Sequence, residues 1–205
     1  KEDITVIYTY TKNPGTEENI KGNEIVKTQI NTIIGANSKF KYVLTYTGRV
    51  EDYKGEATVT ITDTLPYEVL SIDYDNTACT YNETTRLLTC TKTVELDEDN
   101  KEINDIFDVE VTYKNLTSEI DLTILNKATS TLTFGEAAKT DESEVSNVVE
   151  AGTVIAKYVD EANKEIADSV TTTGLIDTDY ETEKKTIYGY TFKEVDGEET
   201  GTYTK

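Results

Sequence analysis

Charged and amide side chains fall on the apolar faces of three strand-like segments, and this pattern limits what the chain can fold into. Residues 58–63 read Thr-Val-Thr-Ile-Thr-Asp, and alternate side chains of an extended strand point to opposite faces. Val59, Ile61 and Asp63 therefore share one face, and threonines occupy the other. The pattern predicts that Asp63 points into a core.

Two further segments show the same misplacement. In residues 122–128, Asn126 falls on the face of the leucine and isoleucine that precede it at intervals of two. In residues 24–30, Lys27 shares a face with an isoleucine. Burying such a group without a partner costs on the order of several kcal/mol. The three residues are therefore expected to compensate one another if they meet.

One reaction would remove the cost for all three. A buried lysine with a lowered pKa is a neutral nucleophile, and a neighbouring protonated carboxyl can polarise an asparagine carbonyl and transfer protons. Loss of ammonia would then leave a neutral amide. Lys27 and Asn126 are thus the candidate crosslink residues, and Asp63 is the candidate catalytic group.

The sequence leaves alternatives open. Asn147 lies on an apparently apolar face of the last strand of this region, and it could be the acceptor in place of Asn126. A simpler reading involves no reaction at all. Lys27 would then extend toward solvent at a sheet edge, Asp63 would cap a turn, and Asn126 would bond to backbone.

Composition bounds the class of protein. The chain has 205 residues, which predicts one or two domains, and two are preferred. Its net charge of −20 argues against nucleic acid or an anionic membrane surface as partner. It contains no histidine and only two cysteines, which disfavours hydrolase triads and zinc sites. We expect no cofactor, no metal site and no enzymatic activity on an external substrate.

Local signals favour a secreted β protein. No apolar run approaches the length of a membrane span, and the N-terminus lacks a signal-peptide pattern, which predicts a mature or excised piece. Threonine, valine, isoleucine and tyrosine recur in short alternating runs, with a break near residues 151–152. Predicted strands span residues 5–10, 24–30, 40–47, 57–63, 68–75, 87–91, 107–113, 121–133 and 144–149, then 153–159, 186–194 and 201–204, with a short strand or turn at 165–166.

The two cysteines fit a local hairpin. Cys79 and Cys90 flank a polar, turn-like stretch at residues 82–86. A disulfide across that hairpin would join paired strands and would imply an oxidising compartment. The alternative is a pair of reduced thiols.

A family resemblance supports the crosslink. The motifs that carry it are Lys-Thr at 27–28, the aromatic run 38–46, Thr-Asp-Thr-Leu-Pro at 62–66, Leu-Asn-Lys-Ala at 125–128 and Ser-Asn-Val at 146–148. They resemble the conserved repeat domains of Gram-positive surface proteins and the C-terminal domains of antigen I/II adhesins. The resemblance covers about residues 23–150 and implies an immunoglobulin-like β-sandwich of the collagen-adhesin (CnaA-like) type. In that type, Lys27 would bond Asn126 with the assistance of Asp63.

The remainder resembles a different module. Residues 154–166, the Ile-Tyr-Gly-Tyr-Thr-Phe run at 187–192 and Gly-Thr-Tyr at 201–203 are similar to the MucBP (mucin-binding protein) repeat. The resemblance implies a small β-grasp-like domain with minor α+β character over residues 151–205, and binding to host mucin. Tyr188 and Tyr190 share a strand face and are the candidate ligand-binding residues, unless they are ordinary half-buried sheet residues.

Residues 1–22 are expected to be an N-terminal strand and linker. Residues 4–10 look like the last strand of a MucBP repeat, so they are predicted to complete a module of another copy. The alternatives are a free arm and local pairing with the sandwich.

Together these features predict a segment of a bacterial adhesin at the cell wall and cell surface. The crosslinked sandwich would be a rigid stalk, and the MucBP-like module would bind host mucin or another glycoprotein. Neighbouring repeats of the same protein are the other expected partners, with no nucleic acid and no membrane insertion. The alternative is a spacer without a ligand. Any catalysis would be autocatalytic amide formation within the chain.

Overall fold

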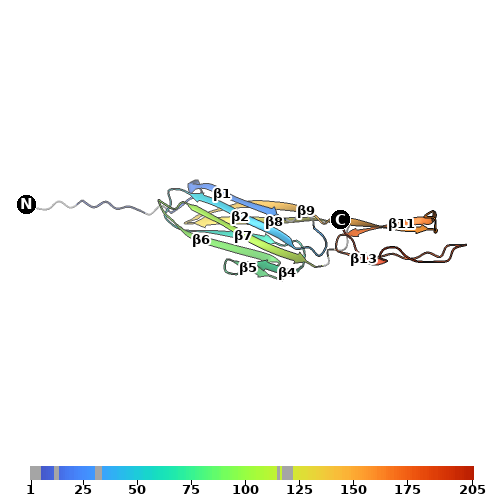
Figure 1. The fold of residues 1–205 in the computed structure, drawn as a ribbon. Helices are drawn as coiled ribbons and strands as arrows, with labels where there is room; N and C mark the ends of the chain where they lie inside the picture. Colours follow the sequence, from blue (N-terminus) through green and yellow to red (C-terminus); the bar gives the residue numbers. More distant parts are fainter. Residues whose placement is uncertain (1–5, 12–13, 31–33, 115, 117–121) are drawn as a thin grey trace, which may run out of the picture.

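The computed structural model describes residues 6–11, 14–30, 34–114, 116 and 122–205 (Figure 1). Apart from one 3₁₀ turn, every regular element in these residues is a strand, which confirms the all-β prediction. The elements are η1 (Glu17–Asn19), β1 (Ile20–Gln29), β2 (Phe40–Val50), β3 (Gly55–Thr64), β4 (Val69–Tyr74), β5 (Cys79–Asn82), β6 (Leu87–Leu96), β7 (Glu102–Tyr113), β8 (Thr123–Phe134), β9 (Ala137–Val148), β10 (Ala151–Val159), β11 (Glu165–Leu175), β12 (Asp179–Glu181) and β13 (Thr200–Thr202).

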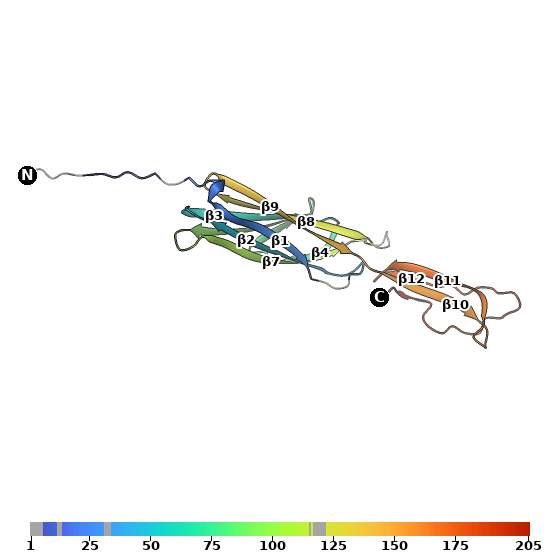
Figure 2. The same ribbon diagram turned by 90° about the horizontal axis from the view of Figure 1, so that it is seen from above.

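Strands β1 to β9 form a two-layer antiparallel sandwich, as predicted. One sheet has the order β1-β2-β7-β4, and the other has the order β5-β6-β3-β8-β9. Both layers are visible in Figures 1 and 2, with the long strands running along the molecule. The first strand and the penultimate strand of the sandwich therefore lie in opposite sheets.

The core between the sheets follows the period of two in the sequence. On β2, Tyr42, Leu44 and Tyr46 are fully buried, and the residues between them are more exposed. On β3, Val59 and Ile61 point inward in the same way. Burial of such faces is the main stabilising contribution to a sandwich.

A seam of side-chain bonds joins β1 to β9 across the two sheets. The backbone N–H of Ile25 donates to Oδ2 of Asp141 at 2.9 Å, and that of Lys27 donates to Oγ of Ser143 at 2.9 Å. These bonds satisfy donors on the outer edge of β1, which would otherwise be open to pairing with another chain. They also fix the position of β1 along β9.

The β5–β6 hairpin carries the predicted disulfide. Cys79 and Cys90 are directly opposite one another in the strand ladder, and their sulfurs are bonded. Both residues are buried. The prediction of a disulfide across this hairpin is therefore confirmed.

Backbone hydrogen bonds connect the sandwich to the C-terminal module. The N–H of Glu150 donates to the carbonyl of Ile34, and the N–H of Ala36 donates to the carbonyl of Ile176, at 2.9 and 2.8 Å. The N–H of Ile176 in turn donates to the carbonyl of Glu150. A loop that precedes β2 is thereby tied to the end of β11 and to the residue that links β9 with β10.

Three strand predictions were wrong. Residues 186–194 form no strand, because Gly189, at φ +87°, lies in a turn in which Tyr190 N–H donates to the carbonyl of Ile187. The short strand or turn expected at 165–166 is instead the start of the eleven-residue β11. Residues 6–10 form no strand, and the predicted start at Thr5 lies outside the described residues.

The structure adds two details on segment bounds. β1 begins at Ile20, which is already part of the sandwich core, three residues before the expected start at residue 23. The C-terminal module is built from β10 to β13 and contains no α-helix in residues 151–205.

Candidate functional site

Lys27 and Asp63 meet inside the sandwich. Lys27 lies on β1 and Asp63 lies on β3 in the opposite sheet, and they are 3% and 1% exposed. The Lys27 Nζ donates a hydrogen bond to Oδ2 of Asp63. Both side chains therefore point inward, as the alternation of each strand predicts.

Burial shifts the pKa values of this pair. Desolvation lowers the pKa of Lys27, and the opposing attraction of Asp63 is the smaller effect. Desolvation likewise raises the pKa of Asp63 against the attraction of Lys27. The two shifts both favour a neutral amine beside a protonated carboxyl, which are the forms that a nucleophile and a general acid require.

Asn126 occupies the same layer of the core without a hydrogen-bond partner. It lies on β8, is 1% exposed and shares a face with Ala128, which is paired with Asp63 on β3. Neither its Nδ2 nor its Oδ1 is hydrogen-bonded to any described residue, and Oδ1 of Asp63 is also unpartnered. An unsatisfied buried polar group costs about 1–3 kcal/mol, so this amide is held at a considerable cost.

Tyr42 lines the site, although its sequence pattern reads as ordinary core. Lys27 Nζ stands 4.6 Å from the centre of its ring, and its hydroxyl is 3.3 Å from that of Tyr113. The hydroxyl also lies near the Asn126 amide, outside hydrogen-bonding geometry. Burial raises the pKa of both tyrosines, so the phenols stay neutral. Tyr42 thus shields the amine and the amide from water without competing for the proton.

The alternative acceptor, Asn147, lies farther along the sandwich. It is on β9 opposite Ile124, is 9% exposed, and its Oδ1 has no partner in the described part of the chain. The backbone of Lys27 is fixed at Ser143, so Asn147 is four residues, about 13 Å, away along β9. Asn126 is paired with Val145, only two residues from Ser143. The register therefore favours Asn126.

The candidate ligand residues of the C-terminal module do not form a pocket with the sandwich site. Tyr188 and Tyr190 lie in the segment between β12 and β13, and both are exposed, Tyr188 completely. Phe192 nearby is also exposed. The prediction that Tyr188 and Tyr190 share a strand face is wrong, because the segment that carries them forms no strand.

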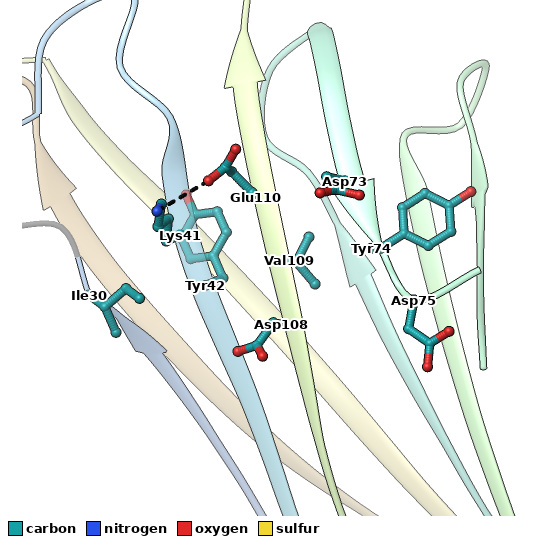
Figure 3. Close-up of a pocket in the computed structure, with 9 residues that line it drawn as sticks. All are labelled: Ile30, Lys41, Tyr42, Asp73, Tyr74, Asp75, Asp108, Val109 and Glu110. Atoms are coloured by element: carbon teal, nitrogen blue, oxygen red, sulfur yellow. Dashed lines mark ion pairs between the residues drawn. The ribbon is translucent and has the colours of Figure 1, made fainter. Parts of the chain in front are cut away.

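A shallow depression lies elsewhere, on the outer face of the β1-β2-β7-β4 sheet (Figure 3). Carboxylates of Asp73, Asp75 and Asp108 surround it, and Lys41 pairs with Glu110 across it at 3.4 Å. It is open to solvent and contains none of the predicted site residues.

Comparison with known proteins defines the C-terminal module. Residues 153–205 match the family model of the MucBP domain, so the MucBP resemblance seen in the sequence is confirmed for this part of the chain. A 55-residue stretch is 46% identical to internalin J of Listeria monocytogenes. That match covers 27% of this chain and only 6% of internalin J.

Solved structures with a similar arrangement include pilus proteins. The major pilin subunit BcpA of Bacillus cereus has a TM-score of 0.48 and 15% identity, over 91% of this chain and 68% of BcpA. The pilus 2b backbone protein of group B streptococcus has a TM-score of 0.46 and 18% identity, over 86% of this chain and 88% of that protein. No helix within the described ranges is long and apolar enough to cross a membrane.

Proposed function

We propose that this chain is a segment of a bacterial surface adhesin whose sandwich is locked by an amide between Lys27 and Asn126. The observation that carries the proposal is the Asn126 amide, buried without a partner beside a lysine and a carboxyl that burial drives toward their neutral forms. An ordinary core would not retain three such groups, because replacing them by apolar residues would remove their desolvation cost. Amide formation removes the same cost.

The reaction balances without any co-reactant. The neutral Nζ of Lys27 attacks Cγ of Asn126 while the protonated Asp63 donates a hydrogen bond to the amide oxygen. Asp63 then relays a proton from Nζ to Nδ2, the bond from Cγ to Nδ2 breaks, and ammonia leaves. The new bond joins Nζ to Cγ, and Asp63 ends in the protonation state in which it began. Each molecule reacts once.

The crosslink would suit a stalk. It would connect β1 and β8, so the roughly 100 residues between them would form a closed loop, which a pull on the chain ends could not extend. In the chain-entropy treatment such a loop stabilises by about 5 kcal/mol, if an amide acts like a disulfide in this respect. Unlike a disulfide, an amide survives reduction. Residues 23–150 would be the rigid unit, and residues 151–205 would be the module it displays.

A tryptic digest analysed by tandem mass spectrometry tests the crosslink directly. We expect one branched peptide in which the segment containing Lys27 is joined to the segment containing Asn126. A branch at Asn147 would reassign the acceptor. Two linear peptides with unmodified Lys27 and Asn126 would refute the reaction.

For the C-terminal module, we propose binding to mucin or another host glycoprotein. The MucBP match and the exposure of the Tyr188 and Tyr190 rings support this, because aromatic faces stack on sugar rings. Retention on immobilised mucin should fall at least severalfold in the Tyr188→Ala/Tyr190→Ala variant. The matched control is Leu70→Ala/Ile106→Ala, which removes two exposed apolar side chains of the sandwich and should leave retention unchanged.

A spacer without a ligand is the second candidate. It is favoured by one observation, namely that Tyr188 and Tyr190 are both exposed, Tyr188 completely, whereas ligand sites are usually concave. Equal and negligible retention of the unmodified chain and both variants would establish this reading and refute mucin binding.

A further inference from the structure

Tyr42 and Tyr113 are buried tyrosines whose hydroxyl groups meet in the core of the sandwich. Each is 1% exposed, and the two hydroxyl oxygens are 3.3 Å apart. Burying a hydroxyl costs free energy unless it is hydrogen-bonded, so phenylalanine suits such a core position better, as at the neighbouring Phe40. The two hydroxyls are therefore retained where packing alone does not require them.

The pair has one proton more than it can use internally. Two hydroxyls carry two protons, and only one of these protons can lie between the two oxygens. Neither hydroxyl has another hydrogen-bond partner within the described part of the chain. One O–H group of the pair is consequently a buried donor that lacks an acceptor.

Packing indicates which of the two protons is spare. The ring of Tyr113 lies edge-on to those of Phe40 and Tyr67, with centroids 5.0 and 6.0 Å away. The hydroxyl of Tyr42 lies near the Asn126 amide. If Tyr113 donates to Tyr42, the proton of Tyr42 is free to point at that amide. The opposite arrangement would leave the proton of Tyr113 among aromatic rings.

Asn126 offers the matching acceptor. Its Oδ1 is buried and has no partner among the described residues. Tyr42 lies on β2 and Asn126 lies on β8, so a donor without an acceptor in one sheet faces an acceptor without a donor in the other. The terminal torsion of an asparagine side chain is broad, so the amide can turn its oxygen toward the hydroxyl at little cost.

We propose that Tyr42 donates a second hydrogen bond to the carbonyl oxygen of Asn126 while the crosslink forms. Tyr113 is the positioning residue that aims this donor. The role rests on the crosslink of the proposed function and adds no reactant to it. When Nζ of Lys27 attacks Cγ, the π electron pair of the carbonyl moves onto Oδ1, where hydrogen bonds from Asp63 and Tyr42 stabilise the charge. The electron pair re-forms the carbonyl as ammonia leaves, and Tyr42 keeps its proton throughout.

The rate of ammonia loss after folding tests this role. The chain is isolated under denaturing conditions, before the crosslink can form, and is then folded by dilution while its intact mass is followed over time. Tyr42→Phe should lower the rate on the order of 10²-fold, which is typical for removal of one such donor. Tyr113→Phe should lower the rate less. It should have no further effect in Tyr42→Phe, because it acts through Tyr42.

The matched control is Tyr46→Phe on the same strand. Tyr46 is also fully buried, and its hydroxyl donates to Oδ1 of Asn23 at 2.7 Å, a partner outside the crosslink site. Each variant loses one hydrogen bond, so both should lower the free energy of unfolding by a similar amount in the Lys27→Met background, which cannot react. Only Tyr42→Phe should lower the rate of ammonia loss.

Three results would overturn the role of Tyr42. An unchanged rate in Tyr42→Phe, or an equal loss of rate in Tyr46→Phe, would show that the hydroxyl contributes to stability alone. A changed pH profile of the rate in Tyr42→Phe would show that Tyr42 transfers a proton. In each case the crosslink itself stands, because the unmodified chain still loses ammonia. An unmodified chain that never loses ammonia would refute the crosslink and this role together.

Discussion

Pulling the folded chain from its two ends should show how much contour length of the sandwich the crosslink prevents from extending. With Lys27 bonded to Asn126, force can straighten only the residues before Lys27 and those after Asn126. The roughly 100 residues between them stay closed in a loop, which withholds about 340 Å of contour length. With the Cys79–Cys90 disulfide reduced, single-molecule force spectroscopy should therefore record a sandwich unfolding step shorter by about 340 Å than the step for an uncrosslinked chain.

The Lys27→Met variant supplies the uncrosslinked reference. Methionine keeps an apolar stem of similar length but cannot form the amide, so its unfolding step should contain the whole sandwich. Lys127→Met, which removes an exposed lysine of β8, is the matched control and should keep the short step. Steps of equal length in the unmodified chain and in Lys27→Met would refute the reasoning.

Three further outcomes are expected. Replacing Cys79 and Cys90 by serine should lower the free energy of unfolding, measured by urea denaturation, by about 3 kcal/mol. The reason is that the disulfide joins residues 11 positions apart and so restricts the unfolded chain. No change would show that the hairpin is already constrained in the unfolded chain. In Lys27→Met, burial keeps the pKa of Asp63 above its usual 3.8, so the folded state holds a proton that the unfolded state has lost. Compared with Lys27→Met/Asp63→Asn, the free energy of unfolding of Lys27→Met should therefore be highest below pH 3.8 and should decline as pH rises through the folded-state pKa of Asp63. Identical pH profiles of the two variants would contradict the burial of this carboxyl. Gly35→Ala would bring a Cβ within 2.1 Å of a carboxylate oxygen of the C-terminal module, so NMR relaxation should show the two modules tumbling more independently; unchanged relaxation would show that the junction tolerates the methyl group.

The sequence predicted the inward residues of the sandwich because strand alternation is a local property. Each of Lys27, Asp63 and Asn126 is placed by its nearest neighbours along one strand, so no knowledge of pairing was needed. The same holds for Cys79 and Cys90, which are close in sequence and opposite in one hairpin. Tyr42 was not recognised as part of the site, because its alternation with apolar residues looks the same whether it packs on leucine or on a lysine.

The C-terminal module was harder to predict for a physical reason. A strand exists only when its backbone groups find a partner, and partners are set by contacts far away in sequence. Residues 186–194 have strand composition but form a turn around Gly189, and residues 6–10 have the same composition without any ladder. In both segments the apolar pattern is present, but neither segment pairs with a strand in the part of the chain that the structure describes.

The most direct test of the central claim is the intact mass of the chain under denaturing and reducing conditions. The account predicts a mass lower than calculated by one ammonia. The deficit should disappear in Lys27→Ala, Asp63→Ala and Asn126→Ala, and it should persist in Asn147→Ala. The full calculated mass for the unmodified chain would contradict the account and leave the three residues as a buried polar cluster that never reacts.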